Sequence, residues 1–186
     1  NRKILNAFAR INGIPDDKLP DFLRSLDKLD KIGAEGVCAE LSEKGILNDK
    51  IRELFASDLM ATLINAAQDE QLQLMAGLVQ GSPLGEEGIN ELRVIHETLL
   101  GYGVEQGCYR FDMTLARGLD YYTGPIFETI VTEPKIGSIT GGGRFDGLIG
   151  LFSKDPVPAT GTSFGLERLV TIMEELGAAD LQASTT

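Results

Sequence analysis

The chain has 186 residues, of which 42% are hydrophobic and 24% are charged, and its 28 Asp and Glu against 17 Lys and Arg give a formal net charge of -11. This composition supports a buried core in one or two domains and excludes a disordered acidic tail or a disulfide-dense miniprotein. The negative charge also disfavours non-specific binding to nucleic acid, because affinity for phosphates comes mainly from Lys and Arg.

Cysteine and histidine are too sparse to indicate a metal site. Cys38 and Cys108 form no CxxC motif and His96 is the only histidine, so we expect no protein-bound metal. His96 falls within a predicted helix, where we expect a structural or solvent-facing role rather than catalysis. No apolar run approaches the roughly 20 residues that cross a bilayer, so we expect a cytoplasmic protein with no membrane partner.

Residues 1–103 are predicted to form helices joined by short turns, because apolar residues recur there at three- and four-residue spacing. The clearest break is the run Gly81-Ser82-Pro83, in which Ser82 is placed to cap the next helix and Pro83 to begin it. Other breaks are predicted at Gly13, Pro15, Gly33 and Gly45. This region is therefore expected to be an all-helical module.

After residue 103 the sequence becomes alternating, β-branched and glycine-rich. Apolar and polar residues alternate over 109–114, which predicts a strand. Further strands are predicted at 126–131, 136–140 and 160–164, with a hairpin turn at 133–135 and a helix at 166–176. We therefore expect an α+β protein with a helical domain at 1–103 and a sheet-containing domain at 104–186.

Three arginines, Arg117, Arg144 and Arg168, lie in glycine-rich turns or where a strand meets a helix. Glycine lets the backbone approach a ligand closely, and a guanidinium binds phosphate or carboxylate in a forked geometry. These residues indicate a site for an anionic small molecule, with salt bridges to the abundant carboxylates as the alternative. The Gly-Gly-Gly run before Arg144 fits neither a Walker A motif nor a dinucleotide-binding GxGxxG.

Two adjacent tyrosines, Tyr121 and Tyr122, follow Arg117 closely. In an extended segment they would point to opposite faces, so at most one could face a site without local distortion. Core packing is the alternative for both side chains.

Three stretches of this half occur in a fixed order: RGLDYYTGPIFE at 117–128, GSITGGGRFDG at 137–147 and GTSFGLER at 161–168. The first two resemble the two histidine-specific motifs of histidyl-tRNA synthetase, and the third resembles motif 3 of class II aminoacyl-tRNA synthetases. NRKIL at 1–5 and DKLDK at 27–31 resemble the family stretch between motif 2 and the first histidine-specific motif. The resemblance covers nearly the whole chain, to about residue 176.

The resemblance implies the fold and the partners of a class II synthetase. Residues 1–103 would be a short catalytic-domain segment and the helical insertion domain that approaches the tRNA acceptor arm. Residues 104–186 would be the C-terminal half of the antiparallel-sheet catalytic domain. The implied enzyme is a histidine-tRNA ligase, which forms histidyl-adenylate from histidine and ATP with Mg2+ and transfers the histidyl group to tRNA(His). A homodimer is expected for the complete protein.

The resemblance also assigns roles to individual residues. Arg117 would contact the α-phosphate and the histidine carboxylate and stabilise charge in the transition state. Tyr121 and Tyr122 would lie at the histidine pocket, where a phenol hydrogen-bonds the imidazole. The other implied residues are Gly141, Gly142 and Gly143 on the pocket floor, and Arg168 and Gly165 at the ATP site. On so acidic a chain, tRNA would need a local basic patch, for which Lys28 and Lys31 are the candidate contacts, with Lys44, Lys50 and Arg52 as further candidates. A solvated helix surface is the alternative for each of them.

The chain also departs from the family pattern. Phe145 stands where the family usually has tyrosine, and motif 1, motif 2 and an anticodon-binding domain are not found in the sequence. We therefore expect no appreciable adenylate formation by this chain alone. The alternatives are a non-catalytic paralogue, such as the histidine-sensing regulatory subunit of ATP phosphoribosyltransferase, and a structural domain with a vestigial pocket. Arg117, the tyrosine pair and Arg168 favour the synthetase over both.

Overall fold

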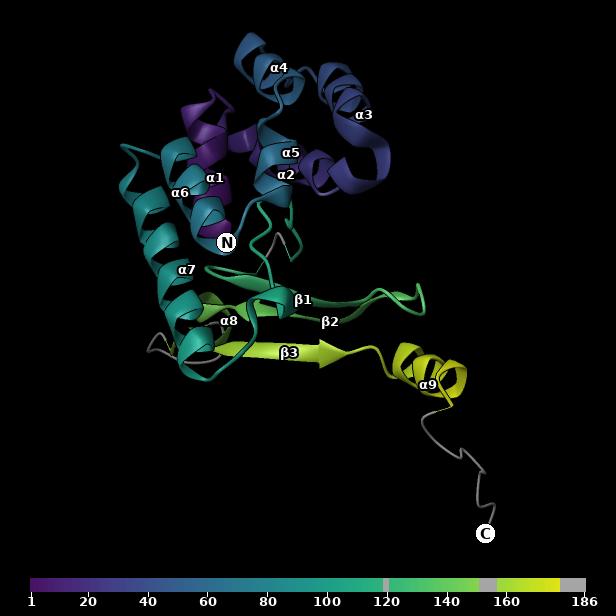
Figure 1. The fold of residues 1–186 in the computed structure, drawn as a ribbon. Helices are drawn as coiled ribbons and strands as arrows, with labels where there is room; N and C mark the ends of the chain where they lie inside the picture. Colours follow the sequence, from purple (N-terminus) through teal and green to yellow (C-terminus); the bar gives the residue numbers. More distant parts are fainter. Residues whose placement is uncertain (119–120, 151–156, 178–186) are drawn as a thin grey trace. The chain divides into compact units, whose positions relative to one another are not determined.

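The computed structural model describes residues 1–118, 121–150 and 157–177 of the chain. It divides into two compact units, Asn1–Pro125, called unit 1, and Ile126–Thr186, called unit 2 (Figure 1). Unit 1 is helical and unit 2 contains an antiparallel sheet, so the expected α+β class is confirmed. The domain boundary predicted after residue 103 stays a prediction. Over the described ranges, no helix combines the length and the apolar character needed to span a membrane.

Each predicted helix of unit 1 is present. The bounds are α1 (Arg2–Ile11), α2 (Leu19–Leu26), α3 (Leu29–Glu43), α4 (Asp49–Ala56), α5 (Leu59–Asn65), α6 (Gln68–Leu78) and α7 (Pro83–Gly101), with short 3-10 helices at Asp16–Lys18 and Gln106–Cys108. Gly33 interrupts α3 with a φ of 69°, a conformation that glycine adopts at little cost, as its predicted role as a break requires. Ser82 caps α7 as expected, since its side chain accepts a hydrogen bond from the N–H of Gly85 at 3.3 Å.

Helices α1 and α7 approach each other closely at Gly88. A Cβ atom at Gly88 would lie 2.7 Å from Cγ1 of Ile4, so only hydrogen fits between the two helices there. Lys3 joins the same pair of helices, because its Nζ lies 2.7 Å from Glu87 and 2.6 Å from Glu91. The burial of Ile4, at 0% exposure, places this contact inside the hydrophobic core of unit 1.

The strand predicted at 109–114 is wrong. Met113 and Thr114 lie in a bend, and side chains of α6 bind the backbone of Tyr109 and Phe111. Gln68 donates to the carbonyl of Tyr109 at 2.7 Å, and the side-chain oxygen of Gln71 accepts from the N–H of Phe111 at 3.0 Å. The buried Gln71 also donates to the carbonyl of Leu63 at 2.8 Å. The alternation of apolar residues therefore reflects one-sided packing on helices and not sheet pairing.

Unit 2 contains a three-stranded antiparallel sheet in the order β1 (Ile126–Val131), β2 (Gly137–Arg144) and β3 (Thr160–Phe164), with α8 at Asp146–Gly150 and α9 at Leu166–Glu175. The strands predicted at 126–131 and 160–164 are confirmed. The strand predicted at 136–140 instead continues through the three glycines to Arg144. Glycine weakens an isolated strand, but in β2 it leaves room for side chains and backbone of β1 and β3, which pair on either side of it.

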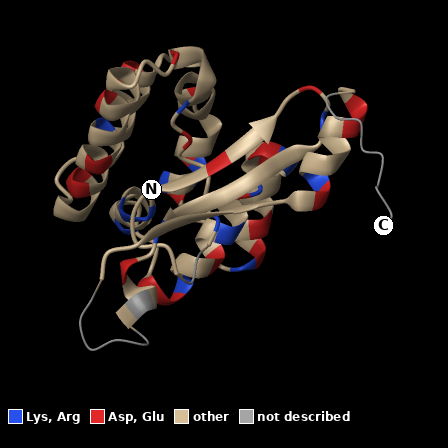
Figure 2. Ribbon diagram, turned by 90° about the horizontal axis from the view of Figure 1, so that it is seen from below, with Lys and Arg blue, Asp and Glu red and all other residues tan. Residues whose placement is uncertain are grey.

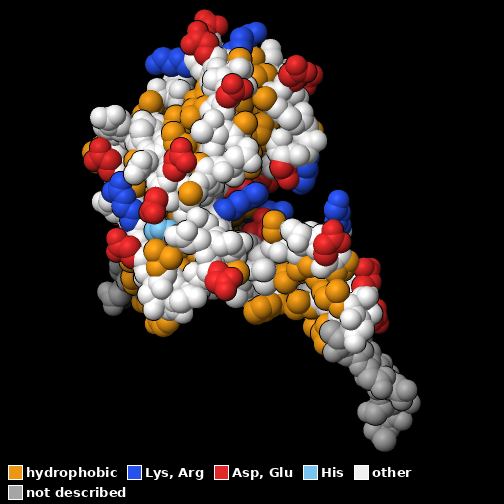
Figure 3. Space-filling view, viewed as in Figure 1, with side chains coloured by type: hydrophobic (Ala, Val, Ile, Leu, Met, Phe, Trp, Pro, Cys, Tyr) orange, Lys and Arg blue, Asp and Glu red, His pale blue; other side chains and the backbone are white. Residues whose placement is uncertain are grey.

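Polar and apolar surfaces are distributed differently over the elements. Acidic and basic side chains are interspersed along the helices, whereas the strands are mostly uncharged (Figure 2). Hydrophobic side chains gather around α9 (Figure 3), and large ones stay exposed there: Phe164 at 66%, Leu166 at 73% and Leu176 at 61%. Apolar surface of this kind marks a region that packs against something else.

We expect Gly88→Ala to lower the free energy of unfolding by about 1–3 kcal/mol, because the added methyl group overpacks the contact with Ile4. Gly77→Ala is the matched control, since Gly77 also lies in a helix but its added Cβ meets nothing within 4 Å. That control is expected to stabilise the protein by up to about 1 kcal/mol through helix propensity alone. Urea unfolding measures both, and equal effects of the two substitutions would contradict the close approach.

Candidate active site

A tight turn carries the first group of predicted site residues. Gly118 has a φ of 62°, and a Cβ atom there would lie 2.1 Å from Cδ2 of Tyr122. The N–H of Tyr122 donates to the carbonyl of Gly118 at 3.2 Å, which closes the turn. Residues 119–120 lie outside the described residues. Backbone conformation and space therefore both require glycine immediately after Arg117.

The two tyrosines lie side by side on this turn. The ring centroids of Tyr121 and Tyr122 are 4.3 Å apart, with an angle of 51° between the planes. Opposite faces were expected for an extended segment, but the chain turns here, and the turn brings both rings together. Burial, followed by a hydrogen bond with Tyr121, raises the pKa of Tyr122 from 10.0 to about 12. The two phenols thus interact with each other, and folding disfavours the ionised form of Tyr122.

Contacts from distant parts of the sequence hold the backbone around Arg117. Arg117 is an exposed residue, and its carbonyl accepts a hydrogen bond from Nη2 of Arg2 at 2.8 Å. The N–H of the buried Ala116 donates to Oδ1 of Asp27 at 3.1 Å, at the end of α2. Sequence reasoning missed Arg2 and Asp27 as parts of the site. The only signal for them was that both lie in stretches that resemble the family.

The single histidine, His96, packs against the segment that leads to Arg117. His96 is 4% exposed, and its Nδ1 lies 2.9 Å from the hydroxyl of Tyr109. Its Nε2 lies 3.2 Å from Oδ1 of Asp69, and its ring packs edge-on against Phe111. These contacts agree with the structural role expected for His96, since they fix the segment that leads to Arg117.

The glycine run of the second motif forms the middle strand of unit 2. Gly142 pairs with Phe127 on β1 and with Thr162 on β3. A Cβ atom at Gly142 would lie 2.3 Å from the carbonyl oxygen of Gly161 and 2.4 Å from Cε2 of Phe127, so glycine is required there by the sheet itself. A Cβ atom at Gly141 would meet nothing within 4 Å, so that position faces open space. Gly143 is buried and completes the run.

Arg168 lies in the first turn of α9 and reaches back to the sheet. Its Nη1 donates to the carbonyl of Ser138 at the start of β2. The N–H of Gly165 donates to the carbonyl of Ile139 at 2.8 Å, which ties the beginning of α9 to the same strand. The exposed guanidinium of Arg168 is therefore held beside β2 in a defined orientation.

The salt-bridge alternative holds for other arginines of this half. Nε of Arg144 binds both carboxylate oxygens of Asp146, at 2.9 and 2.8 Å. Arg110 pairs with Asp112 at 3.4 Å. The guanidinium of Arg144 therefore pairs with a carboxylate of its own unit, although Arg144 ends the glycine run that indicated an anion site.

The two lysines proposed to meet tRNA differ in their surroundings. Nζ of Lys28 lies 2.9 Å from Glu40, and Nζ of Lys44 lies 2.5 Å from the same carboxylate. Hydrogen bonds from Lys28 and then Lys44 lower the pKa of Glu40 from 4.5 to about 2. Lys31 is exposed and pairs with no carboxylate in the described part of the chain. Lys31 therefore presents its charge to solvent, whereas that of Lys28 is balanced internally.

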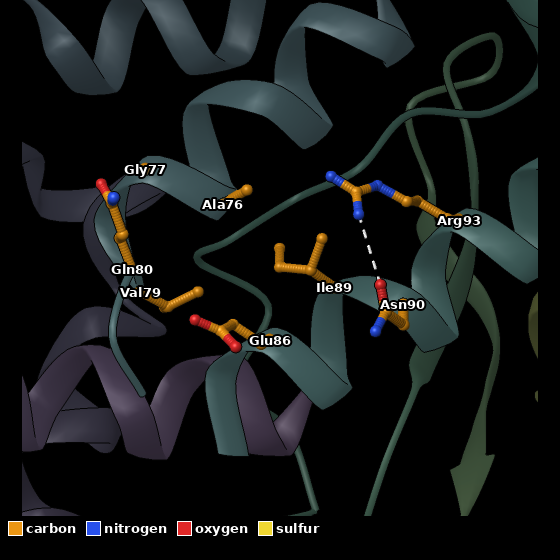
Figure 4. Close-up of a pocket in the computed structure, with 8 residues that line it drawn as sticks. All are labelled: Ala76, Gly77, Val79, Gln80, Glu86, Ile89, Asn90 and Arg93. Atoms are coloured by element: carbon orange, nitrogen blue, oxygen red, sulfur yellow. Dashed lines mark hydrogen bonds between the residues drawn. The ribbon is translucent and has the colours of Figure 1, made fainter. Parts of the chain in front are cut away.

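A separate groove of about 450 Å³ lies between α6 and α7 (Figure 4). Its floor includes Val79 and Ile89, and its rim includes Glu86, Asn90 and Arg93. Arg93 donates to Asn90 at 3.3 Å on one side of the groove. No residue assigned to the site by sequence lines it. Across the described ranges, no group of three or more His, Cys, Asp or Glu side chains is placed to hold a metal ion.

Each unit by itself offers a distinct set of groups for a ligand. The turn of unit 1 offers a guanidinium and two phenols, which suit a carboxylate or phosphate and a polar ring. Unit 2 offers an open glycine strand with a second guanidinium beside it, which suits a flat group and further phosphate oxygens. The profile of the family described as histidyl-tRNA synthetase matches residues 4–169. The chain belongs to this family.

Individual relatives agree with the histidyl-tRNA synthetase family. A protein of Christiangramia forsetii named histidine--tRNA ligase is 43% identical over 181 residues, which is 95% of this chain and 38% of that protein. The crystal structure of histidyl-tRNA synthetase from Nostoc sp. PCC 7120 has a TM-score of 0.83 and 29% identity, covering 97% of this chain and 42% of that one. The chain thus spans about two fifths of the length of the curated relatives it matches.

A third similarity concerns the fold alone. The crystal structure of an ATP phosphoribosyltransferase regulatory subunit/histidyl-tRNA synthetase from Bacillus halodurans C has a TM-score of 0.72 with 23% identity, over 91% of this chain and 42% of that one. At this identity the match shows that the chain shares the synthetase fold.

We expect Tyr122→Phe to reduce the loss of stability at alkaline pH. Since the pKa of Tyr122 is about 12 when folded and 10.0 when unfolded, the unfolded chain releases this proton first as the pH rises. The wild type therefore loses free energy of unfolding between pH 10 and pH 12, and phenylalanine removes this contribution. Urea unfolding at about pH 9 and pH 11 measures the decline.

Tyr102→Phe is the matched control for this experiment, because it removes a phenol that is 84% exposed. Equal declines for the wild type and Tyr122→Phe would show that the pKa of Tyr122 is not raised by folding.

Proposed function

We propose that this chain is the insertion-domain and late catalytic-domain part of a cytoplasmic histidine-tRNA ligase. The enzyme would activate histidine with MgATP to histidyl-adenylate and transfer the histidyl group to tRNA(His). The observation that carries this proposal is the turn at Gly118, which directly follows Arg117 and packs against the ring of Tyr122, itself beside Tyr121. The name of the Dictyostelium discoideum relative, histidine--tRNA ligase, cytoplasmic, supports the compartment.

Arg117 is proposed as the catalytic cation. Attack of the histidine carboxylate on the α-phosphorus of ATP builds negative charge on the phosphate oxygens, and pyrophosphate leaves. A guanidinium keeps its charge at any physiological pH and stabilises that charge without accepting or donating a proton. Because its backbone is held by Arg2 and, through Ala116, by Asp27, little reorganisation is needed when charge develops.

The tyrosine pair is proposed to select histidine. A phenol is neutral at physiological pH and can hydrogen-bond an imidazole nitrogen. A site built around such a group discriminates against amino acids whose side chain offers no matching hydrogen-bond partner. The ring of Tyr121, 47% exposed, is proposed to form the open side of this pocket.

Unit 2 is proposed to hold ATP and the flat part of the substrates. Gly141 faces open space on β2 and would let a ligand lie against the backbone, with Gly142 and Gly143 beside it. Arg168 would stack on adenine and reach the γ-phosphate, and Gly165 would allow that approach at the start of α9. Mg2+ would enter with ATP as part of the substrate, offsetting phosphate charge.

The chain alone is proposed to be inactive. Within the described residues β1 and β3 each pair only with β2, so each has an edge that can accept another strand. Exposed apolar side chains around α9 support packing against further structure (Figure 3). We propose that segments equivalent to motifs 1 and 2 supply these contacts, together with a second copy in a homodimer.

The function is tested by grafting this chain into a relative. Residues 1–186 replace the matching segment of the Christiangramia forsetii protein, whose sequence is 43% identical, and the product is called the chimera. We expect the chimera to catalyse histidine-dependent ATP-pyrophosphate exchange, while the purified 186-residue chain does not. In the chimera, Arg117→Met is expected to lower the exchange rate about 100-fold or more, because the charge that meets the phosphate is lost.

Arg110→Met is the matched control for Arg117→Met, because Arg110 lies in the same unit and pairs with Asp112. It is expected to leave the exchange rate within about twofold. A folded chimera that binds histidine without exchange would contradict the proposal and favour the non-catalytic paralogue.

Contact with tRNA is proposed for Lys31, with Lys28 as a weaker candidate. We expect Lys31→Glu to reduce the slope of log Kobs against log salt concentration for tRNA(His) binding by about 1, because one phosphate contact is lost. Lys28→Glu is less informative, since it would place a negative charge beside Glu40. Lys135→Glu, an exposed position in unit 2, changes the net charge equally and serves as control. An unchanged slope for Lys31→Glu would remove this residue from the interface.

A further inference from the structure

Arg2 binds both ends of the turn that carries the proposed catalytic residues. Its Nη2 donates to the carbonyl of Arg117 at 2.8 Å, and its backbone N–H donates to the carbonyl of Gly124 at 2.9 Å. The side chain of Arg2 belongs to the core and is only 6% exposed. One residue therefore fixes the separation between the beginning and the end of this segment.

The position of Arg2 is itself fixed by two helices. Arg2 is the first residue of α1, next to Asn1, whose side-chain nitrogen donates to the carbonyl of Gly88 at 3.2 Å and to Glu91 at 2.8 Å. On its other side, Lys3 forms ion pairs with Glu91 and Glu87. The start of α1 cannot shift along α7 without breaking these contacts. Arg2 thus reaches the turn from a rigid support.

We propose that Arg2 is the positioning residue of the 117–124 turn, holding Arg117 at a fixed distance from the Tyr121-Tyr122 pair. A guanidinium suits this task because its donors lie in a rigid plane and its charge does not vary with physiological pH. Arg2 acts through the backbone and needs no contact with substrate. The identity of the ligand that benefits from this spacing rests on the proposed function.

Hydrogen exchange tests the mechanical part of this inference. In the full chain without substrate, we expect Arg2→Met to accelerate amide exchange at Tyr121 and Tyr122 by about tenfold or more, because the carbonyl of Arg117 loses its bond to Nη2 while the backbone bond to Gly124 stays. Arg10→Met, at an exposed position on the same helix, is expected to leave these rates unchanged. Equal rates in the two variants would overturn the inference. Arg2→Lys supplies the same comparison if Arg2→Met does not fold, with a smaller acceleration because the lysine ammonium can still donate to the carbonyl of Arg117.

Kinetics in the chimera test the functional part. Arg2→Met is expected to raise the KM for histidine and lower kcat, for a combined loss of about tenfold or more in kcat/KM. The KM for ATP is expected to change less than about twofold, because adenine binding is proposed for Arg168 in unit 2. A purely structural role would lower the melting temperature and affect both substrates together, and that result would overturn the inference. Hydrogen exchange needs no ligase activity, so an inactive unsubstituted chimera would count against the proposed function alone.

Discussion

The contact between α1 and α7 at Gly88 sets the geometry on which the candidate site depends. Because Gly88 has no side chain, Ile4 of α1 packs directly against α7, and Asn1 and Lys3 fix the start of α1 there by polar contacts. Arg2 extends from this junction to the turn that begins at Arg117. The placement of a cation on the protein surface thus depends on packing in the core of unit 1. A methyl group added at Gly88 would therefore displace α1, and with it Arg2 and the turn that Arg2 contacts.

Helices and most strands could be predicted from the sequence because their signals are local. Apolar spacing predicted the helical character of residues 1–103, and Ser82 with Pro83 predicted the start of α7. The segment at 109–114 could not be predicted in this way, because alternation records which side of a segment is buried and not what binds its backbone. Its partners are the side chains of Gln68 and Gln71, which a periodicity argument does not weigh.

The candidate site shows the same division between local and distant information. Motif resemblance found Arg117 and the tyrosine pair, since all three lie in one short stretch, but the extended geometry assumed for them hid the contact between the rings. The turn depends on Gly118, which has a positive φ. A glycine in the sequence is compatible with a positive φ but does not require it, so the turn could not be predicted. Arg2 and Asp27 lie far from Arg117 in sequence, and only folding shows that they bind around it. Likewise, the sequence shows that Lys28 carries a positive charge, but only the fold shows that this charge is paired with Glu40.

The amide of Gln71 uses both of its ends in the interior. Its nitrogen donates to Leu63 and its oxygen accepts from Phe111, which joins α5 to the segment that leads into the site. Glutamate has almost the same shape and would keep the acceptor, but it would lose the donor and bury a negative charge. Substitution tables treat this exchange as mild. At this position, replacing one nitrogen by an oxygen would separate an intact support from a broken one, although Gln71 lies outside the candidate site.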